Sequence, residues 1–237
     1  MNEKRFLAKY RPEDFARPSV AVDVVVLTVK DQSLCVLLVQ RNEHPFKGRW
    51  ALPGGFLRVG PSAKEQGEDL DAAAARELEE ETGLGRDQVF LDQLRAFGAP
   101  MRDPRLRVVS IAYFALVRPD LLPRVRPGGD ASRVRWTPVD EATTLAFDHD
   151  TILKTALEHV RARLETTAIS QSLVGDTFTI PELRAAFEIV TGKKLDRGNF
   201  RRKFQGLVEG GVVERAPGKR ATASKPAAVY RFRSAIG

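Results

Sequence analysis

Residues 76–84 read Arg-Glu-Leu-Glu-Glu-Glu-Thr-Gly-Leu, and Glu68 precedes this stretch with seven residues between it and Arg76. On a helix, Glu77, Glu80 and Glu81 stand at positions i, i+3 and i+4, so their three carboxylates share one face. Like charges this close repel one another unless a cation lies between them, and Mg²⁺ or Mn²⁺ prefers such oxygen ligands and shares them with phosphates. The stretch therefore predicts a helix with a divalent-metal site for pyrophosphate chemistry. The alternative is an acidic helix face in solvent, the usual use of an isolated charge run.

Glycine-containing segments flank this helix. Upstream is Trp50-Ala-Leu-Pro-Gly-Gly-Phe56, and downstream Gly83 provides a left-handed helix end. A glycine loop, an acidic helix and a glycine stop in this order resemble the Nudix box. In that family pattern a glycine is followed after five residues by a glutamate, and after seven more by Arg-Glu-apolar-any-Glu-Glu-any-Gly-apolar. From Glu68 onward the chain matches the pattern completely.

This resemblance implies an α/β fold, the Nudix α/β/α sandwich, with the box as a loop-helix-loop site. It implies that Glu77, Glu80 and Glu81 serve catalysis and that Arg76 orients a glutamate. The implied cofactor is Mg or Mn, and the implied metal ligands are Glu68, Glu77, Glu80, Glu81 and Gly55.

The chain departs from the family pattern before the helix. Twelve residues separate Gly55 from Glu68 instead of five, so residues 61–67 are interpreted as an insertion of seven. Loop lengthening costs only about 0.6 kcal/mol per doubling, so the fold should tolerate it. Catalysis is more sensitive, because a positional error of about 1 Å lowers a rate roughly a hundredfold. The sequence leaves open whether the glutamates support hydrolysis.

Charge is distributed unevenly along the 237 residues. Residues 1–165 carry 25 Lys and Arg against 25 Asp and Glu, whereas residues 166–237 carry 13 against 6. The net charge of +7 therefore belongs to the last 72 residues. This asymmetry indicates two domains, residues 1–165 and a basic domain of residues 166–237, with nucleic acid as the leading partner of the second.

Membrane association is not expected. No apolar run approaches the roughly 18–20 residues that span a bilayer. The first ten residues lack the apolar core of a signal peptide. The sequence therefore predicts a cytoplasmic protein, and its single Cys35, in an apolar run, is interpreted as a core residue.

The first domain has a mixed pattern of strands and helices. Asp31-Gln-Ser33 predicts a turn that joins the first two strands as a hairpin. The predicted strands are 20–29, 34–40, 89–97, 108–117 and 134–138, and the predicted helices are 69–81 and 151–164.

The pattern changes after about residue 165. Thr179 caps a predicted amphipathic helix that runs to Val190, and Asp196 caps a second helix over residues 197–209. Strands are expected at 210–215 and 228–233, with a basic loop over 216–226 between them. Two helices followed by a hairpin are typical of a winged helix-turn-helix domain.

The second of these helices is basic on its polar side, which predicts contacts with the major groove of DNA. The predicted contacts are Arg197, Asn199, Arg201, Arg202 and Lys203 on the helix, with Lys219, Arg220 and Lys225 in the wing for phosphate or minor groove. The alternative is a solvated basic helix beside a hairpin used for oligomerisation or for RNA.

The two domains together resemble the Nudix-related transcriptional regulators of NAD metabolism. The resemblance implies a homodimeric repressor that binds a double-stranded DNA operator and senses ADP-ribose or a related nucleotide, in NAD-related or nucleotide-sugar metabolism. The alternative is a metal-dependent ADP-ribose pyrophosphatase, and the two activities are compatible. The segments that carry the resemblance are residues 17–23, 50–56, 102–110, 147–153 and 195–203.

Arginines and aromatic residues supply the predicted nucleotide contacts, since arginine matches phosphate oxygens and aromatic rings stack on a base. These contacts are Arg17, Trp50, Phe56, Arg102 and Arg105. A surface role for the arginines and a core role for Trp50 and Phe56 stay open. His149, between two aspartates, is interpreted as part of a capped surface turn in preference to a catalytic base.

Overall fold

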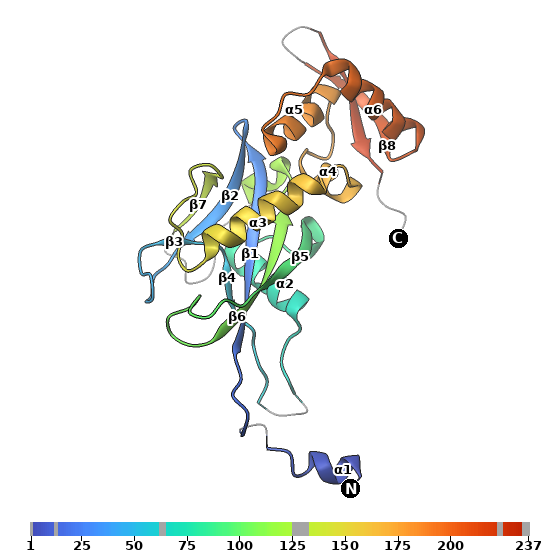
Figure 1. The fold of residues 1–237 in the computed structure, drawn as a ribbon. Helices are drawn as coiled ribbons and strands as arrows, with labels where there is room; N and C mark the ends of the chain where they lie inside the picture. Colours follow the sequence, from blue (N-terminus) through green and yellow to red (C-terminus); the bar gives the residue numbers. More distant parts are fainter. Residues whose placement is uncertain (1, 12–13, 62–64, 125–132, 222–224, 234–237) are drawn as a thin grey trace.

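A computed structural model describes residues 2–11, 14–61, 65–124, 133–221 and 225–233 (Figure 1). Residues 62–64 of the predicted insertion lie outside this range. The elements of the first domain are α1 (Glu3–Leu7), β1 (Ser19–Lys30), β2 (Ser33–Gln40), β3 (Trp50–Ala51), β4 (Gly54–Phe56), α2 (Leu70–Thr82), β5 (Phe90–Phe97), β6 (Val108–Leu116), β7 (Val134–Pro138) and α3 (His149–Ala162), with 3-10 helices at Arg86–Gln88 and Pro119–Arg124.

One mixed sheet forms the centre of this domain. Its strands run in the order β3-β2-β1-β6-β5, with β4 paired to β1 and β7 paired to β2. β1 and β6 are parallel, and the other pairs are antiparallel. The predicted hairpin is confirmed: Lys30 pairs with Ser33 across a turn in which Asp31 and Gln32 have φ of 47° and 61°.

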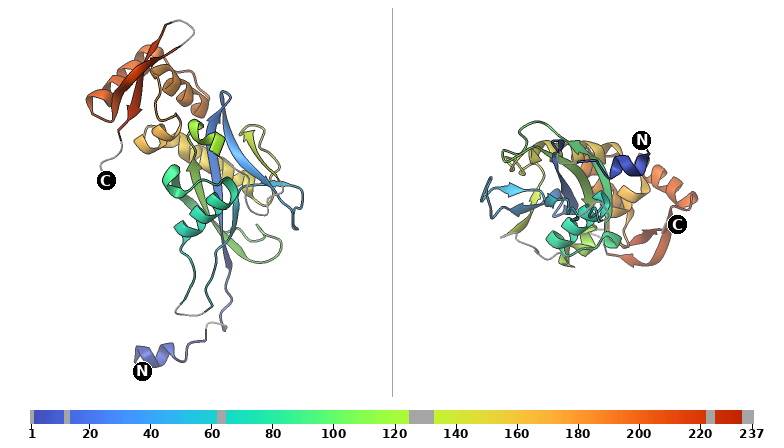
Figure 2. Two further views of the ribbon diagram at one scale, coloured as in Figure 1. Left: turned by 180° about the vertical axis from the view of Figure 1, so that it is seen from behind. Right: turned by 90° about the horizontal axis from the view of Figure 1, so that it is seen from below.

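Helices cover both faces of the sheet, α2 on one side and α3 on the other (Figures 1 and 2). Successive residues of β1 point to opposite faces, so Val24 enters the core under α2 while Val25 enters the core under α3. Both faces are buried, which explains why β1 is apolar at nearly every position. The predicted α/β/α sandwich is confirmed.

The C-terminal part holds two capped helices and a hairpin. Its elements are α4 (Thr167–Ser172), α5 (Ile180–Thr191), α6 (Arg197–Glu209), β8 (Val213–Arg220) and β9 (Ala227–Phe232). Thr179 and Glu182 form a capping box at the start of α5, and Asp196 accepts from the Asn199 N–H at 2.8 Å at the start of α6. The predicted winged helix order is confirmed, although the buried one-and-a-half turns of α4 had no counterpart in the prediction.

The predicted loop over residues 216–226 is wrong in its first part, because β8 continues through Arg220. Gly218, at φ 90°, lies in a bulge between Arg215 and Lys219, after which pairing with β9 resumes. Ala216 is buried within this strand. Residues 222–224 of the predicted loop lie outside the described residues.

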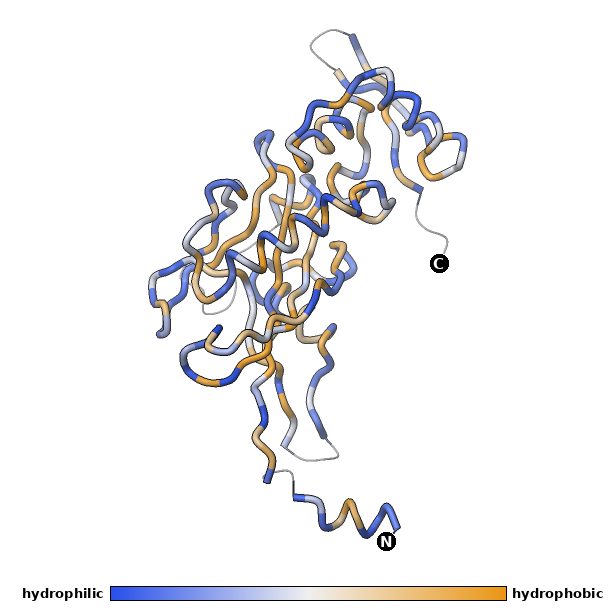
Figure 3. Tube along the Cα trace, in the orientation of Figure 1, coloured by the Kyte–Doolittle hydropathy of each residue, from blue (hydrophilic) through white to orange (hydrophobic). Residues whose placement is uncertain are grey.

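The apolar core is continuous between the two parts. One cluster runs from the sheet through Val160 of α3 and Ile169 of α4 to Phe178 and Phe204 of the winged helix domain. Apolar segments follow this path in Figure 3. Among the described residues, no helix has the length and apolar content needed to cross a membrane.

Candidate functional site

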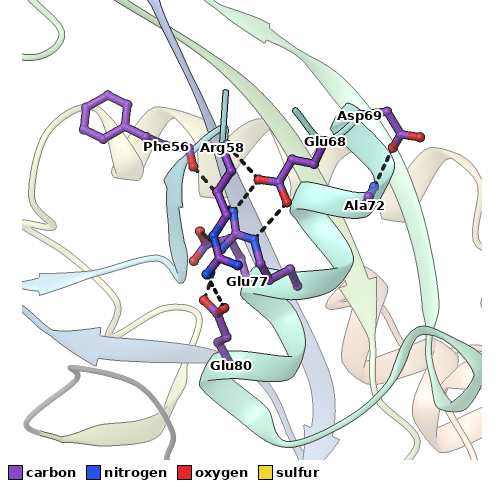
Figure 4. Close-up of polar contacts among 8 residues, drawn as sticks. Phe56, Arg58, Glu68, Asp69, Ala72, Glu77 and Glu80 are labelled. Carbon is purple, nitrogen blue, oxygen red and sulfur yellow. Dashed lines mark hydrogen bonds and ion pairs between the residues drawn. The ribbon is translucent and has the colours of Figure 1, made fainter. Parts of the chain in front are cut away.

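Arg76 forms hydrogen bonds with the three carboxylates of the acidic cluster, Glu68, Glu77 and Glu80, which Figure 4 labels. Its guanidinium donates to Glu68 at 2.7 and 3.0 Å, to Glu77 at 2.7 Å and to Glu80 at 3.1 Å. Arg58 adds a second cation, since its side chain donates to Glu80 and its backbone N–H donates to Glu68, both at 2.9 Å. The structure therefore brings these three glutamates together and balances their charge with two arginines.

Both ends of α2 are fixed, which holds the acidic side chains in place. Asp69 accepts from the Ala72 N–H at 2.7 Å, and the N–H of Gly83, at φ 70°, donates to Glu79 at 2.8 Å. Leu78 anchors the opposite face in the core. Glu81, one turn beyond Glu77, is half-buried on the same helix.

The arginines and burial act on different carboxyls of the cluster. Hydrogen bonds from Arg76 hold the pKa of Glu68 at about 2. Burial raises the pKa of Glu77 from its ordinary value, against the opposing effect of Arg76. Glu68 is therefore ionised at neutral pH, whereas Glu77 is the carboxyl whose charged form is penalised by its surroundings.

Gly55 lies directly against Glu77. A Cβ on Gly55 would stand 2.3 Å from Glu77 Oε1, so a side chain at this position would displace the carboxylate. The oxygens gathered here are the donors that a hard divalent cation prefers. Within the described ranges, however, no three His, Cys, Asp or Glu side chains already form a metal-binding group. The donor chemistry fits Mg²⁺ or Mn²⁺, while the glutamates are engaged with arginine.

A pocket opens beside the cluster and shares Gly55 with it. We call it the β4 pocket: it has a volume of about 240 Å³ and is lined by Ala21, Asp23, Arg41, Glu43, Leu52, Gly54, Gly55, Phe56, Arg102, Asp103, Arg105, Val108, Phe147 and His149. Arg105 lies 5.3 Å from the ring centre of Phe56 and 5.9 Å from that of Phe147. Arg41 lies 4.7 Å from the Phe147 ring. The pocket thus combines aromatic faces with guanidinium groups.

The predicted ligand arginines differ in their freedom to meet a ligand. Arg102 is buried and donates to Asp148 at 2.6 and 3.0 Å and to Asp23 at 3.1 Å. It therefore joins β1 to the residue that precedes α3. Arg105 pairs with Asp103 at 2.7 Å but keeps 40 % of its side chain exposed, so it presents charge to the pocket.

His149 is buried, so the predicted surface turn is wrong. Its Nδ1 accepts from the Leu52 N–H at 2.9 Å, and its Nε2 lies 3.4 Å from Asp23. The first turn of α3 packs against the strand ends here, which removes the histidine from solvent. Burial raises the pKa of Asp23, but His149, Ser110 and Arg102 outweigh it and hold the value at about 2.

Two predicted ligand residues lie outside the lining of the pocket. Trp50 is half-buried against the α3 side of the core, with Arg135 at 4.0 Å from its ring, and Arg17 is exposed ahead of β1. Asp23 was missed, although a single acid between valines in a buried strand was a readable signal. Phe147, at φ 55°, lines the pocket; it begins one of the segments that carry the resemblance, but nothing in the sequence indicated a ligand role for it.

The predicted DNA contacts of α6 point in three directions. Phe200 and Phe204 face the core, and exposed Arg202 lies on the opposite side, where it donates to Asn199. Arg197 and Arg201 line a cavity toward the hairpin. Asn199 and Lys203 line another, toward the segment after α3, where Lys203 forms an ion pair with Glu165.

Two of the three predicted wing residues, Lys219 and Arg220, also differ. Arg220 donates to Glu182 at 2.7 Å and to the Thr177 hydroxyl at 2.9 Å, so it ties the wing to the start of α5. Lys219, one residue earlier, is exposed on β8. Lys219 is therefore better placed than Arg220 to meet an external anion.

Comparison with known proteins places both parts of the chain. Residues 17–158 match the NUDIX domain family, and residues 171–232 match the NrtR DNA-binding winged helix domain. The chain belongs to the Nudix family. Its acidic cluster lies in the Nudix box. Its second domain matches the NrtR DNA-binding winged helix domain.

Relatives of this Nudix protein include a regulator and an enzyme. It is 35% identical over 233 residues to the "ADPR responsive transcriptional repressor NtrR" of Acinetobacter baylyi. The match covers 98% of this chain and 88% of that protein. It is 38% identical over 152 residues to the "ADP-ribose pyrophosphatase" of Methanocaldococcus jannaschii. This match covers 64% of this chain and 79% of that protein.

Solved structures of Shewanella oneidensis NrtR resemble the whole chain and its Nudix domain. The complex with a 27mer DNA has a TM-score of 0.75 at 30% identity and covers 90% of this chain and 93% of that one. The NUDIX domain complexed with ADP ribose has a TM-score of 0.58 at 34% identity and covers 68% of this chain and 99% of that one.

The Nudix box of this chain carries its insertion outside the acidic cluster. Val59 and Gly67 pair in an antiparallel bridge, and the Glu68 N–H donates to the Arg58 carbonyl at 3.1 Å. Arg58 and Glu68 therefore lie side by side, next to the bridge. With this bridge in place, Glu68 stays within hydrogen-bond distance of Arg76.

Proposed function

We propose that this protein is a DNA-binding transcriptional repressor of NAD-related or nucleotide-sugar metabolism that responds to ADP-ribose or a related nucleotide. The observation that carries the proposal is its 35% identity with the Acinetobacter repressor over 98% of the chain. The match includes both the Nudix domain and the winged helix domain, so the same two parts are joined in the same order.

The operator is double-stranded DNA, and α6 is the element that meets its major groove. Arg202 and Asn199 are exposed on the outer side of this helix, and arginine and asparagine are suited to hydrogen bonds with base edges. Lys219 of the wing supplies a cation for the backbone. Binding should therefore weaken steeply as salt is raised.

The nucleotide effector is assigned to the β4 pocket. Phe56 and Phe147 offer faces on which a base stacks, and Arg41 and Arg105 beside these rings match the oxygens of a pyrophosphate. Arg102 has a different role, because its bonds to Asp23 and Asp148 hold the pocket wall together. Arg17 and Trp50 contact the nucleotide only if the pocket extends beyond its present lining.

α3 provides a route from this pocket to the DNA-binding domain. It begins at His149 in the pocket wall, and near its other end Arg161 donates to the Val190 carbonyl in the last turn of α5 at 2.9 Å. A nucleotide that shifts the Arg102–Asp148 contact therefore acts on a helix that also holds the winged helix domain.

The test is an electrophoretic mobility shift with the DNA upstream of the protein's own gene, with and without ADP-ribose. We expect a complex at moderate salt that a random duplex does not form and that ADP-ribose alters. Arg105→Gln should keep the complex and lose the ADP-ribose effect, whereas the matched control Arg95→Gln, an exposed arginine outside the pocket, should keep both. No preference over random duplex would reject the repressor.

We propose further that the protein acts as a homodimer, which would read two half-sites about one helical turn or a multiple apart. Support comes from the N-terminal segment around α1. Phe6, Leu7, Tyr10 and Phe15 are 46–61 % exposed there, an apolar surface suited to association. Light scattering coupled to size-exclusion chromatography should give twice the monomer mass, and a monomeric mass at working concentration would reject the dimer.

Hydrolysis of ADP-ribose is a second candidate function, favoured by the identity with the Methanocaldococcus pyrophosphatase and by the complete set of box glutamates. The residues that would hold Mg²⁺ or Mn²⁺ are Glu68, Glu77, Glu80, Glu81 and the Gly55 carbonyl, with Arg76 orienting the glutamates. Such a cation would neutralise the pyrophosphate and lower the pKa of a bound water. Here Arg76 and Arg58 already neutralise Glu68 and Glu80, so a metal must compete with them.

Chromatography of ADP-ribose incubated with Mg²⁺ or Mn²⁺ tests the enzyme. An active protein should release AMP and ribose phosphate, and Glu80→Gln or Glu81→Gln should abolish the release while DNA binding stays intact. Wild-type protein that yields no metal-dependent product would leave the Nudix domain as a sensor alone.

A further inference from the structure

We infer that one phosphate strand of the DNA runs along a groove between α5, α6 and the wing, where Arg184 joins Arg197 and Arg201 as a phosphate contact. Arg202, on the neighbouring face of α6, then reads base edges. This inference rests on the proposed DNA-binding function. It states which residues contact the DNA backbone and which contact the bases.

The groove, called here the wing groove, has a volume of about 630 Å³. Its cations come from three parts of the chain: Arg184 from α5, Arg197 and Arg201 from α6, and Lys225 two residues before β9. None of the described residues that line it is acidic. The groove is therefore complementary in charge to a polyanion.

The opposite flank of α6 has a different electrostatic character. The cavity on that side contains Lys203 and Lys194, but it also contains Glu165 and Asp196. Glu165 forms an ion pair with Lys203 there. Of the two flanks, only the wing groove is lined by positive charge without acidic residues in the described part of the chain.

Two cations of the wing groove are neighbours on α6. Arg197 and Arg201 are one turn apart on α6, a spacing at which like charges repel. Arg184 is fixed nearby, because its guanidinium donates to the Leu195 carbonyl at 3.3 Å and lies 3.7 Å from Glu188. An anion in the groove would relieve this repulsion, as a backbone phosphate does.

Helix geometry separates phosphate contacts from base contacts. Each residue advances about 100° around the axis, so Arg202 lies roughly 100° from Arg201 and faces away from buried Phe200 and Phe204. When Arg202 points into the major groove, Arg197 and Arg201 face the strand that borders the groove on the wing side. Arg184 lies on that same side.

Fluorescence anisotropy over a salt series tests this division, with a duplex that wild-type protein selects from randomised DNA and a random duplex of equal length. Arg184→Gln and Arg201→Gln should each lower the slope of log K against log salt by about 1 and weaken both duplexes equally. Arg202→Ala should lower the preference for the selected duplex by about 5- to 150-fold. Lys154→Gln, an equal charge change at an exposed site on α3, should alter neither quantity.

Each outcome separates the groove from the parent proposal. If wild-type protein selects no sequence, the repressor proposal fails, while slopes on random duplex still test the groove. If Arg184→Gln keeps the wild-type slope and an unchanged melting temperature, Arg184 is no phosphate contact and the inference is overturned. If Arg201→Gln changes the sequence preference but not the salt slope, Arg201 contacts bases and the inference is overturned for this residue. Arg184→Lys keeps the charge, so it should restore most of the slope even where the contact with Leu195 is lost.

Discussion

Lys203 of α6 forms an ion pair with Glu165, three residues beyond the end of α3. Both side chains are partly exposed, and such pairs contribute only about 0–1 kcal/mol to stability. The position of the pair gives it more importance than its strength. The pair connects Lys203 on the DNA-facing helix to the segment that follows α3. The other end of α3 begins in the wall of the β4 pocket.

Glu165→Gln should therefore strengthen DNA binding and weaken the response to ADP-ribose. Freed from its carboxylate, Lys203 becomes available to phosphate, which should raise the salt slope by about 1. Anisotropy titrations with and without ADP-ribose measure both effects. Glu158→Gln, an exposed acid on α3, is the control of equal charge. Equal behaviour of the two variants would contradict a role for the pair.

Arg102→Met should destabilise the Nudix domain. Arg102 is 9 % exposed and holds both Asp23 and Asp148, so its removal leaves two carboxylates near the pocket without their cation. Breaking a buried ion pair from one side costs about 3–5 kcal/mol. Urea unfolding should show this loss, and Arg107→Met, at an exposed arginine, should stay near wild type. A loss below that of the control would indicate that the aspartates find other partners.

Asp23 should make stability depend on pH in the acid range. Its pKa is about 2 in the folded protein, below the ordinary 3.8, so its contribution is fully present above about pH 4 and is lost as the pH falls through 2. The shift corresponds to about 2 kcal/mol. Asp23→Asn removes this titration, so the difference in unfolding free energy between the two proteins should shrink toward acid. A difference that stays constant from about pH 5 to pH 2 would rule out Asp23 as the cause.

Gly206→Ala should stabilise α6 and weaken DNA binding at once. A Cβ at Gly206 would meet nothing within 4 Å, and alanine favours a helix interior over glycine by about 0.8–1 kcal/mol. Gly206 follows Arg202 by one turn, so the added methyl group would project toward the DNA. Thermal melting and anisotropy should move in opposite directions. Gly198→Ala, whose Cβ would lie 3.3 Å from the capping carboxylate of Asp196, should give no comparable stabilisation.

Much of the fold was readable because local signals agreed with tertiary packing. The bounds of α6 match the prediction because Asp196 caps the helix and its apolar side chains recur at helical spacing. These side chains are Phe200, Phe204, Leu207 and Val208. The β1–β2 hairpin followed from a polar turn between two apolar runs. α4 was missed because a six-residue helix shows too little periodicity, and β8 was cut short because Pro217 and Gly218 signal a turn even where a bulge lets pairing resume.

The acidic cluster was predictable for the same reason, since helical spacing alone aligns Glu77 and Glu80. The β4 pocket was only partly predictable: Phe56, Arg102 and Arg105 were among the expected contacts, but its lining comes from β1, β4, β6, four connecting segments and the start of α3. No periodicity relates Asp23 to His149 across 125 intervening positions, and only the packed sheet brings them within 3.4 Å. The flanks of α6 were likewise invisible, because Glu165 and the wing decide which cations remain open to solvent.

The bridge between Val59 and Gly67 makes the position of Glu68 independent of the length of the segment between these two residues. The bridge holds Arg58 and Glu68 next to each other. A peptide tag or a reporter domain inserted between Val59 and Gly67 should therefore leave the spacing of the acidic cluster unchanged. The bridge thus marks a graft point for following the protein in a living cell.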